Sequence, residues 1–306
     1  MMARPGRGGV GVTVAIVMAT LALVAPARAD TLTVGVFAPA APLPGTPARL
    51  ELAGQLATHL ARAIDADGVG RVYARASDFA AAAGRGEVQL AVVDPSYAAT
   101  AGLVVLAVGT RAGSSSWGWE LIGPAGVNLA ALRGKRVLVP SVGGRETDFV
   151  LGGLLGGELP RGYFAAIDVA PDAVSALAAV RLGKAAAAAV PSATPVPSGL
   201  ARIVRLAETP LPVLVIADAK LGADQRSRLA AAAASFSGDG VLAGFRPGGA
   251  DAVRALGRRL SPPARRPPFL VPTLRVLVGD LLGDRAATIK RTSGTVFAVE
   301  ALPPAE

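Results

Sequence analysis

The stretch "VQLAVVDPSYAATAGLVVLAVGT", residues 88–110, decides the fold. An apolar run ends at Asp94, and Pro95 stands where the first residue of a short helix is expected. Gly102 ends that helix, and a second apolar run follows directly. Parallel strands joined through helices are covered on both faces, so they are apolar throughout. The stretch therefore predicts a strand–helix–strand unit of an α/β protein.

The same alternation of strand and helix continues on both sides of this unit. We expect further strands at 31–37, 69–75, 119–124, 136–140, 163–169, 185–191 and 201–208. We expect helices at 48–64, 76–86, 128–135, 143–157, 170–184, 223–236 and 250–260. The strand at 119–124 leads into a second unit of the same design, and residues 209–218 return to the first. After a proline-rich segment, 273–279, 287–291 and 295–302 predict a β-rich tail with a hairpin.

Residues 1–29 have the pattern of a secretory signal peptide. Arg4 and Arg7 precede an apolar stretch from Val10 to Val24, and Ala27-Arg28-Ala29 is a small-x-small cleavage site before Asp30. The alternative is an anchor that stays in the membrane. We expect cleavage, a periplasmic location, and a mature protein that is soluble and has no membrane span. A G-x-G-x-x-G match at 6–11 lies inside this segment, where it follows no strand, so it does not indicate a dinucleotide site.

Composition excludes several classes of function. The chain has no cysteine and only one histidine, His59, which lies on an expected helix. A disulfide framework, a zinc site and a Ser-His-Asp triad are therefore not expected, and we predict no enzyme activity, no metal and no cofactor. The formal net charge is +9, of which three charges belong to the leader, and aromatic residues make up only 4% of the chain. Nucleic acid is not an expected partner, whereas a small anion suits the basic balance.

Three loops carry polar groups suited to a ligand. Open α/β sheets bind ligands beyond the carboxyl ends of their strands, and backbone N–H groups beside glycines suit an oxyanion. The candidate ligand-binding residues are Ser96, Tyr97, Ser116, Trp117, Ser141, Gly143, Gly144, Arg145 and Thr147.

Each candidate has a structural alternative. Serine and threonine can simply cap helices, and Arg145 can grip the anion or pair with Glu146 or Asp148. Asp94 can contact a ligand or cap the following helix, and we favour the cap. We expect His59 to be a packed or half-exposed helix residue.

Three motifs resemble one family in the right order. "GEVQLAVVDPSY" at 86–97 resembles a segment of periplasmic type 2 solute-binding proteins of the phosphate/phosphonate (PhnD-like) class. "LAALRGKRV" at 129–137 is similar to their signature at the entry to the second lobe, and "ALAAVRLGKAAA" at 176–187 resembles a helix–strand pair of theirs. The resemblance implies that Tyr97 lies in the cleft and that Ser141 opens the segment that grips the anion.

The resemblance also implies an architecture. It is the two-lobed α/β fold of type 2 periplasmic binding proteins with two crossing strands, here with a small β-rich C-terminal extension. Residues 1–29 are then the signal peptide, 30–112 and 209–256 form lobe 1, and 113–208 form lobe 2. Residues 257–306 are the linker and the extension.

The function implied is that of a secreted substrate-binding protein of an ABC importer. It would capture a small anionic solute, phosphonate- or phosphate-like, in the cleft between the lobes, and deliver it to an ABC permease as a monomer. Ligand contacts to both lobes would drive closure. The alternative is an orphan envelope sensor or interaction protein of the same fold with a degenerate cleft.

Overall fold

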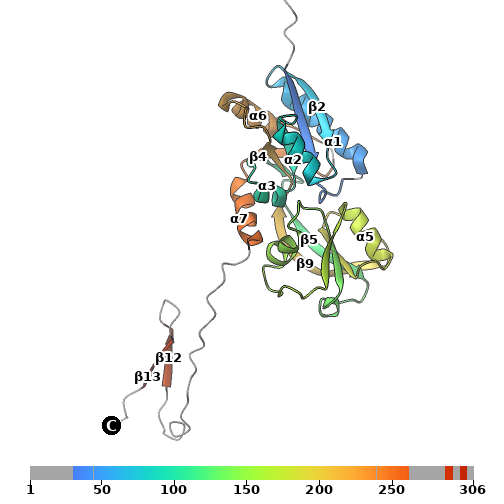
Figure 1. Cartoon of the computed structure of the whole chain (residues 1–306), viewed down its shortest axis with the longest axis vertical. Coiled ribbons are helices and arrows are strands. Elements are labelled where there is room, and N and C mark those ends of the chain that lie inside the picture. Colours follow the sequence, from blue (N-terminus) through green and yellow to red (C-terminus); the bar gives the residue numbers. More distant parts are fainter. Residues whose placement is uncertain (1–29, 44, 239, 262–286, 292–296, 302–306) are drawn as a thin grey trace, which may run out of the picture. The chain divides into compact units, whose positions relative to one another are not determined.

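The computed structural model describes residues 30–43, 45–238, 240–261, 287–291 and 297–301 (Figure 1). Two compact units divide the chain, residues 1–261 and 262–306, and each is described by itself. The leader predicted for residues 1–29 and the strand predicted at 273–279 lie outside the described residues. No helix within the described ranges is long and apolar enough to cross a membrane.

Lobe 1 of the larger unit is built on a six-stranded sheet. Its strands are β1 (Thr31–Phe37), β2 (Asp67–Val72), β3 (Leu90–Val93), β4 (Val104–Thr110), β10 (Val213–Ile216) and β11 (Gly244–Pro247), in the order β11-β4-β10-β3-β1-β2. β1 pairs in parallel with β2 and β3, whereas β10 and β11 run antiparallel to their neighbours. The helices of this lobe are α1 (Gly45–Arg62), α2 (Ala76–Gly84), α3 (Pro95–Ala101), α6 (Ala223–Ser235) and α7 (Ala250–Leu260).

Lobe 2 is built on a five-stranded sheet. Its strands are β5 (Ser116–Pro124), β6 (Arg136–Pro140), β7 (Ala166–Ala170), β8 (Ala187–Pro191) and β9 (Leu200–Pro210), in the order β7-β6-β8-β5-β9. β6 is parallel to β7 and β8, and β5 is antiparallel to β8 and β9. α5 (Ala173–Arg181) begins after Asp172, whose Oδ1 accepts a hydrogen bond of 2.7 Å from the N–H of Ser175.

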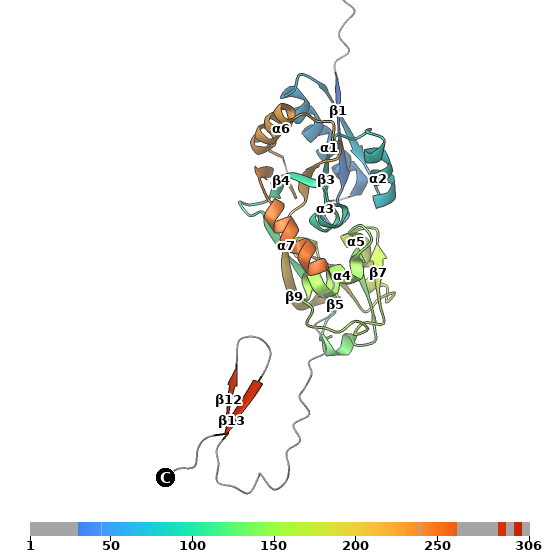
Figure 2. The same cartoon turned by 60° about the vertical axis from the view of Figure 1, so that its left-hand side comes forward.

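The chain passes between the sheets twice. β4 leads into β5, and β9 leads back into β10, so the paired strands β5 and β9 join the two lobes (Figure 2). The predicted α/β architecture with two lobes and two crossing strands is confirmed. In the smaller unit, β12 (Ala287–Arg291) and β13 (Phe297–Ala301) pair antiparallel, so the predicted hairpin is also confirmed.

Three local predictions were incomplete. The helix expected at 143–157 is a three-residue α-helix, α4 (Glu146–Asp148), followed by a π-helix from Phe149 to Leu154. The helix expected at 128–135 is one 3₁₀ turn, and β11 had not been predicted. In the segment expected as a helix at 143–157, Gly152 has a packing role, because a Cβ there would lie 2.3 Å from the carbonyl oxygen of Arg259 in α7.

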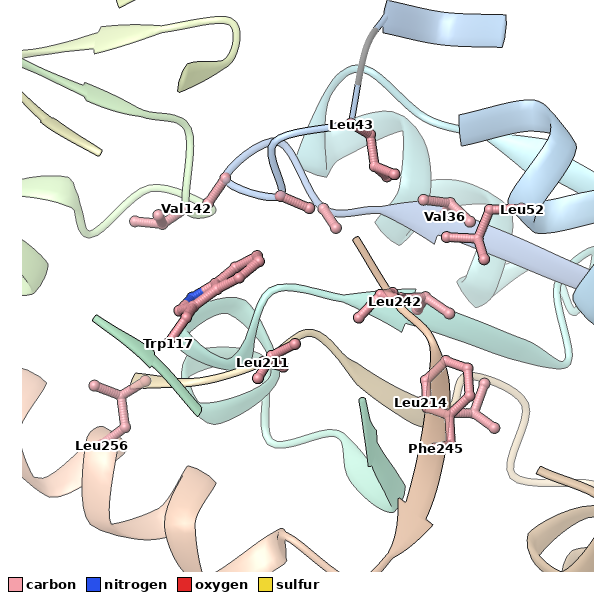
Figure 3. Close-up of a cluster of buried hydrophobic side chains, with 14 of the residues drawn as sticks. Val36, Leu43, Leu52, Trp117, Val142, Leu211, Leu214, Leu242, Phe245 and Leu256 are labelled. Carbon is pink, nitrogen blue, oxygen red and sulfur yellow. The ribbon is translucent and has the colours of Figure 1, made fainter. Parts of the chain in front are cut away.

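One hydrophobic cluster runs through both lobes. It includes the apolar faces of α1 and β1 in lobe 1 and of β6 and the π-helix in lobe 2. Figure 3 shows Trp117 of β5 near Val142 of lobe 2 and Leu211 of the return crossing, with Leu43 of lobe 1 farther along the same cluster. The junction between the lobes is therefore an apolar contact as well as a chain connection.

Helix α1 packs directly on β2 because two strand positions are glycine. A Cβ built on Gly70 would lie 2.4 Å from the backbone nitrogen of Gly54, and one on Gly68 would lie 2.5 Å from the carbonyl of Ala57. Real Cβ atoms do not approach backbone so closely, so the spacing between helix and sheet depends on these glycines.

We expect Gly70→Ala to lower the free energy of unfolding by about 1–3 kcal/mol, since the added methyl must push α1 from the sheet. Chemical denaturation measures the change. Gly84→Ala is the matched control: it lies in α2 with no heavy atom within 4 Å of its built Cβ, and it should be neutral or stabilising by about 0.4–1 kcal/mol. Equal effects of the two variants would contradict the packing role.

Candidate functional site

The two lobes meet where loops leave the carboxyl ends of their strands. Gly143, in the loop after β6, lies against Tyr97, in α3 directly after β3: a Cβ at Gly143 would be 2.3 Å from Cδ2 of the tyrosine. Tyr97 is held edge-on by Phe37 at 5.0 Å and by Phe79 at 5.7 Å between ring centroids. The structure thus brings two sequence-predicted site residues from different lobes into contact.

Trp117 shares a buried cluster with Val142, the residue before Gly143, and Ser116 does not. Trp117 is buried in the cluster that also holds Val142 of the loop after β6 (Figure 3). Successive side chains of a strand point to opposite faces. Ser116 therefore faces the other way, where its Oγ donates a hydrogen bond of 2.8 Å to Oε2 of Glu208.

The loop from Ser141 to Thr147 is closed on itself by a carboxylate. Oε1 of Glu146 accepts hydrogen bonds from the N–H of Val142 at 3.1 Å and from the N–H of Gly144 at 3.0 Å. Gly143 and Gly144 have φ angles of +99° and +104°, which other residues rarely adopt. The N–H groups of Val142 and Gly144, which we expected to bind an external oxyanion, are therefore hydrogen-bonded to Glu146.

Arg145 is paired with groups of the chain itself. Its guanidinium donates to Oδ2 of Asp148 at 2.9 Å and to the carbonyl oxygen of Leu260, at the end of α7, at 2.6 Å. This is one of the two pairings that the sequence had left open. The arginine fastens lobe 2 to α7, where a cation at a helix C-terminus is favourable.

The remaining sequence candidates are divided between buried and exposed positions. Ser96 is buried beside Tyr97 at the start of α3, and Ser141 is half-buried, with its N–H donating to the carbonyl of Ala170 at 3.0 Å. Gly144 and Thr147 are exposed. Outside this region, Nε2 of His59 lies 2.9 Å from the carbonyl oxygen of Ala232, as a packed helix histidine would.

Asp94 does not cap α3 through its side chain, contrary to the favoured prediction. It occupies the N-cap position, but its Oδ2 instead accepts a hydrogen bond of 3.0 Å from the N–H of Ala40, in the loop after β1. The side chain is 1% exposed, and its Oδ1 has no partner among the described residues. Burial raises the pKa of Asp94 from 3.8 to about 7, against the opposing effects of the Ala40 hydrogen bond and the charge of Arg49.

Arg49 is a candidate site residue that the sequence analysis did not include. It lies in α1 in register with the buried residues Leu52, Ala53 and Leu56, so it faces inward at the end of the helix that follows β1. Its Nε and Nη2 atoms are buried and have no hydrogen-bond partner in the part of the chain that the structure describes. The sequence did carry a signal for Arg49, because a charged residue stands there in the apolar stripe of an expected helix.

The buried side-chain atoms without hydrogen-bond partners all belong to residues that follow the carboxyl end of a strand. Among the described residues they belong to Arg49, Tyr73, Asp94 and Thr194. Arg49, Tyr73 and Asp94 follow the carboxyl ends of β1, β2 and β3, and Thr194 follows that of β8. Buried polar groups are nearly always hydrogen-bonded, so these exceptions mark the strand edges at which such folds hold ligands. No group of three metal-ligating side chains was found among the residues described.

Comparison with known proteins identifies the fold. No protein-family model and no curated protein matches the chain. XAC2383 from Xanthomonas citri bound to ATP matches with a TM-score of 0.58 and 14% identity, over 76% of this chain and 97% of that chain. PhnD1 from Prochlorococcus marinus in complex with methylphosphonate matches with a TM-score of 0.58 and 13% identity, over 76% and 98%. The binding protein component of an ABC phosphonate transporter from Pseudomonas aeruginosa gives 0.54 and 11%, over 76% and 88%.

At these identities the likeness shows the fold. The chain has the two-lobed fold of type 2 periplasmic binding proteins, as its motifs had indicated. Two of these structures hold a bound small molecule, and the third is named a binding protein.

The contact between Gly143 and Tyr97 can be tested by substitution. We expect Gly143→Ala to force the loop away from Tyr97 and to expose Trp117, which would shift its fluorescence emission to longer wavelength. Gly144→Ala is the control, because it has the same kind of backbone strain but no heavy atom within 4 Å of its built Cβ. If both variants show the same emission, Gly143 and Tyr97 are not in contact in solution.

The buried carboxyl of Asp94 predicts a dependence of stability on pH. Its pKa is higher in the folded chain than in the unfolded chain, so the folded state binds more protons between about pH 4 and about pH 7. This group therefore makes the free energy of unfolding fall as pH rises through that window. Asp94→Asn cannot ionise, so the stability of the variant relative to the parent should rise from pH 4 to pH 7 and then level off.

Urea denaturation at a series of pH values measures this difference. Glu51→Gln, an exposed carboxylate on α1, is the control and should show no such trend. A flat difference for Asp94→Asn would mean that the carboxyl titrates as an ordinary exposed acid.

Proposed function

We propose that the chain is a solute-binding protein that captures a small anionic solute between its lobes, with Arg49 as the group that binds the anion. The observation that carries this proposal is the pair of buried, unpartnered nitrogens of its guanidinium. Nε and Nη2 form one edge of the guanidinium fork, and such an edge binds two oxygens of a carboxylate, phosphate or phosphonate at once. Leaving a buried guanidinium edge unpaired is costly, so a bound oxyanion would stabilise the site.

Asp94 predicts a second feature of the solute, a group that can form a hydrogen bond with its side chain. Its free Oδ1 is an acceptor when the carboxyl is ionised and a donor when it is protonated. The Oδ1 of Asp94 and the two nitrogens of Arg49 are all without partners, so these atoms are not hydrogen-bonded to each other. We therefore propose that the solute is a small oxyanion that also carries a hydroxyl or amino group, which would pair with Oδ1 of Asp94. Tyr97 and Trp117 supply the apolar contacts that orient small ligands in such clefts.

The cellular setting is part of the proposal. A leader at residues 1–29 would export the chain to the periplasm, and an ABC permease would receive the solute. The phosphonate class is supported by the motifs at 86–97, 129–137 and 176–187, and by the fold shared with the methylphosphonate complex of PhnD1.

A second candidate function is an envelope sensor or interaction protein of the same fold. It is favoured by the loop after β6, whose N–H groups are taken by Glu146, and by the apolar contact of Val142 with the cluster around Trp117. Such a protein would use its surface or its C-terminal unit rather than its cleft.

The two candidates differ in small-anion binding. Thermal unfolding of residues 30–306 would be followed with phosphate, phosphonates, sulfonates and amino acids, because a ligand that binds the folded state raises the melting temperature. We expect at least one oxyanion to raise it and Arg49→Met to weaken that binding at least tenfold, since methionine keeps the apolar stem without the guanidinium.

Arg62→Met is the matched control on the exposed face of the same helix and should bind as the parent does. Arg145→Ala should also keep its affinity, because that side chain is paired with Asp148 and Leu260. If no small anion shifts the melting temperature, the sensor function becomes the better explanation.

A further inference from the structure

Helix α7 packs on both lobes at once. On the lobe 1 side, a Cβ built on Gly257 would lie 3.3 Å from Cβ of Ala99 in α3. On the lobe 2 side, a Cβ on Gly153 of the π-helix would lie 3.2 Å from Cδ2 of Leu260 and 3.6 Å from Cδ1 of Leu256. Both leucines are buried, and Figure 2 shows α7 running from lobe 1 to beside α4 of lobe 2. If the lobes separated, α7 would have to expose one of these packed faces to water, which is unfavourable.

Lobe 2 has a seat for the last turn of α7, formed by Arg145 and Gly152. The final carbonyl groups of a helix have no partner within it. Nη2 of Arg145 donates to the carbonyl oxygen of Leu260 at 2.6 Å, and this charge-assisted bond also complements the negative end of the helix dipole. A Cβ on Gly152 would lie 2.3 Å from the carbonyl oxygen of Arg259, so only glycine leaves room for that oxygen. Lobe 2 therefore accommodates two consecutive carbonyl groups of α7.

The other end of α7 is fixed to lobe 1 by the chain itself. Gly248 and Gly249 connect β11 to α7 with φ angles of +94° and +92°, which glycine adopts readily. A Cβ on Gly249 would lie 2.8 Å from Cβ of Val108 in β4, so the helix begins directly on the lobe 1 sheet. Besides the covalent crossings at β5 and β9, α7 is thus a further link between the lobes, and contacts alone hold its lobe 2 end.

We propose that α7 is a strap that holds the lobes together without a solute, and that its last turn must leave lobe 2 before the lobes can separate. This inference goes beyond the proposed function, because it depends neither on the solute nor on Arg49. It gives a role to Arg145 and to the glycines of the π-helix, which the proposed solute site does not use. Entry of a solute between the lobes would then require release of the strap.

Pulsed electron paramagnetic resonance can measure the distance between the lobes. The chain has no cysteine, so Ala80→Cys on α2 and Val174→Cys on α5, both at exposed positions, give the only two sites for spin labels. The labelled parent, refolded from guanidinium chloride to remove any bound solute, should show one distance, with separated lobes in less than about 10% of the molecules. Adding Arg145→Met and Gly152→Ala should produce a second, longer distance in more than about 10% of the molecules, because both carbonyl contacts are lost.

The matched control combines Arg161→Met with Gly54→Ala. Arg161 pairs with the same Asp148 as Arg145 does, and among the described residues it makes no hydrogen bond to α7. Gly54 lies in α1 with no heavy atom within 4 Å of its built Cβ. The control should show the single distance of the parent. The strap is overturned if the labelled parent shows two distances, or if the variant that lacks both seat residues shows only the parent's distance.

Hydrogen exchange gives a second test, which also serves if the double variant does not fold. Exchange of the amides in residues 253–261 reports release of the last turn even when released molecules are rare. We expect it to be about tenfold faster in Arg145→Met than in the parent, because a charge-assisted hydrogen bond is lost, and unchanged in Arg161→Met. Equal exchange in the two variants overturns the strap. The joined arrangement remains the major one in Arg145→Met, in keeping with the unchanged solute affinity expected of Arg145→Ala.

Discussion

The antiparallel pairing of β5 with β9 is the constraint on which the two-lobed structure depends. It runs from Ser116 opposite Pro210 to Pro124 opposite Leu200, and it carries the chain into lobe 2 and back. The indole Nε1 of Trp119 donates to Oγ1 of Thr209 at 2.8 Å, which joins the strands at a buried position. Because side chains alternate along a strand, this register also decides which side chains of β5 and β9 point toward the junction between the lobes. Trp117 is therefore packed between the lobes, while the side chain of the neighbouring Ser116 points to the opposite face and is hydrogen-bonded to Glu208.

The junction between the lobes is asymmetric in its chemistry. Lobe 1 contributes buried polar atoms without partners, on Arg49 and Asp94, after the carboxyl ends of parallel strands. Lobe 2 contributes a loop whose amides already bind Glu146 and whose Gly143 and Val142 present small or apolar surface. The buried polar atoms without partners that face this junction are thus concentrated in lobe 1, and lobe 2 supplies apolar surface and a loop closed by its own hydrogen bonds.

Much of the fold could be predicted from sequence because it is encoded locally. Apolar strands alternating with amphipathic helices predicted both sheets and the crossings. The site was harder, because its side chains are directed by tertiary contacts. Asp94 follows a strand and precedes Pro95, as a cap would, yet the N–H that it binds belongs to Ala40, 54 residues away. Likewise Arg145 is drawn to the end of α7, which no local pattern reveals.

The same contacts bear on how the lobes respond to a solute. A ligand shifts the balance between two arrangements only by its difference in affinity for them. Here the lobes make contacts of their own across the cleft, through Gly143 with Tyr97 and through the cluster of Val142 and Trp117. Apolar contacts of this kind favour the joined arrangement whatever the charge of the solute. The joined arrangement therefore has contacts of its own and does not depend on a bound solute alone.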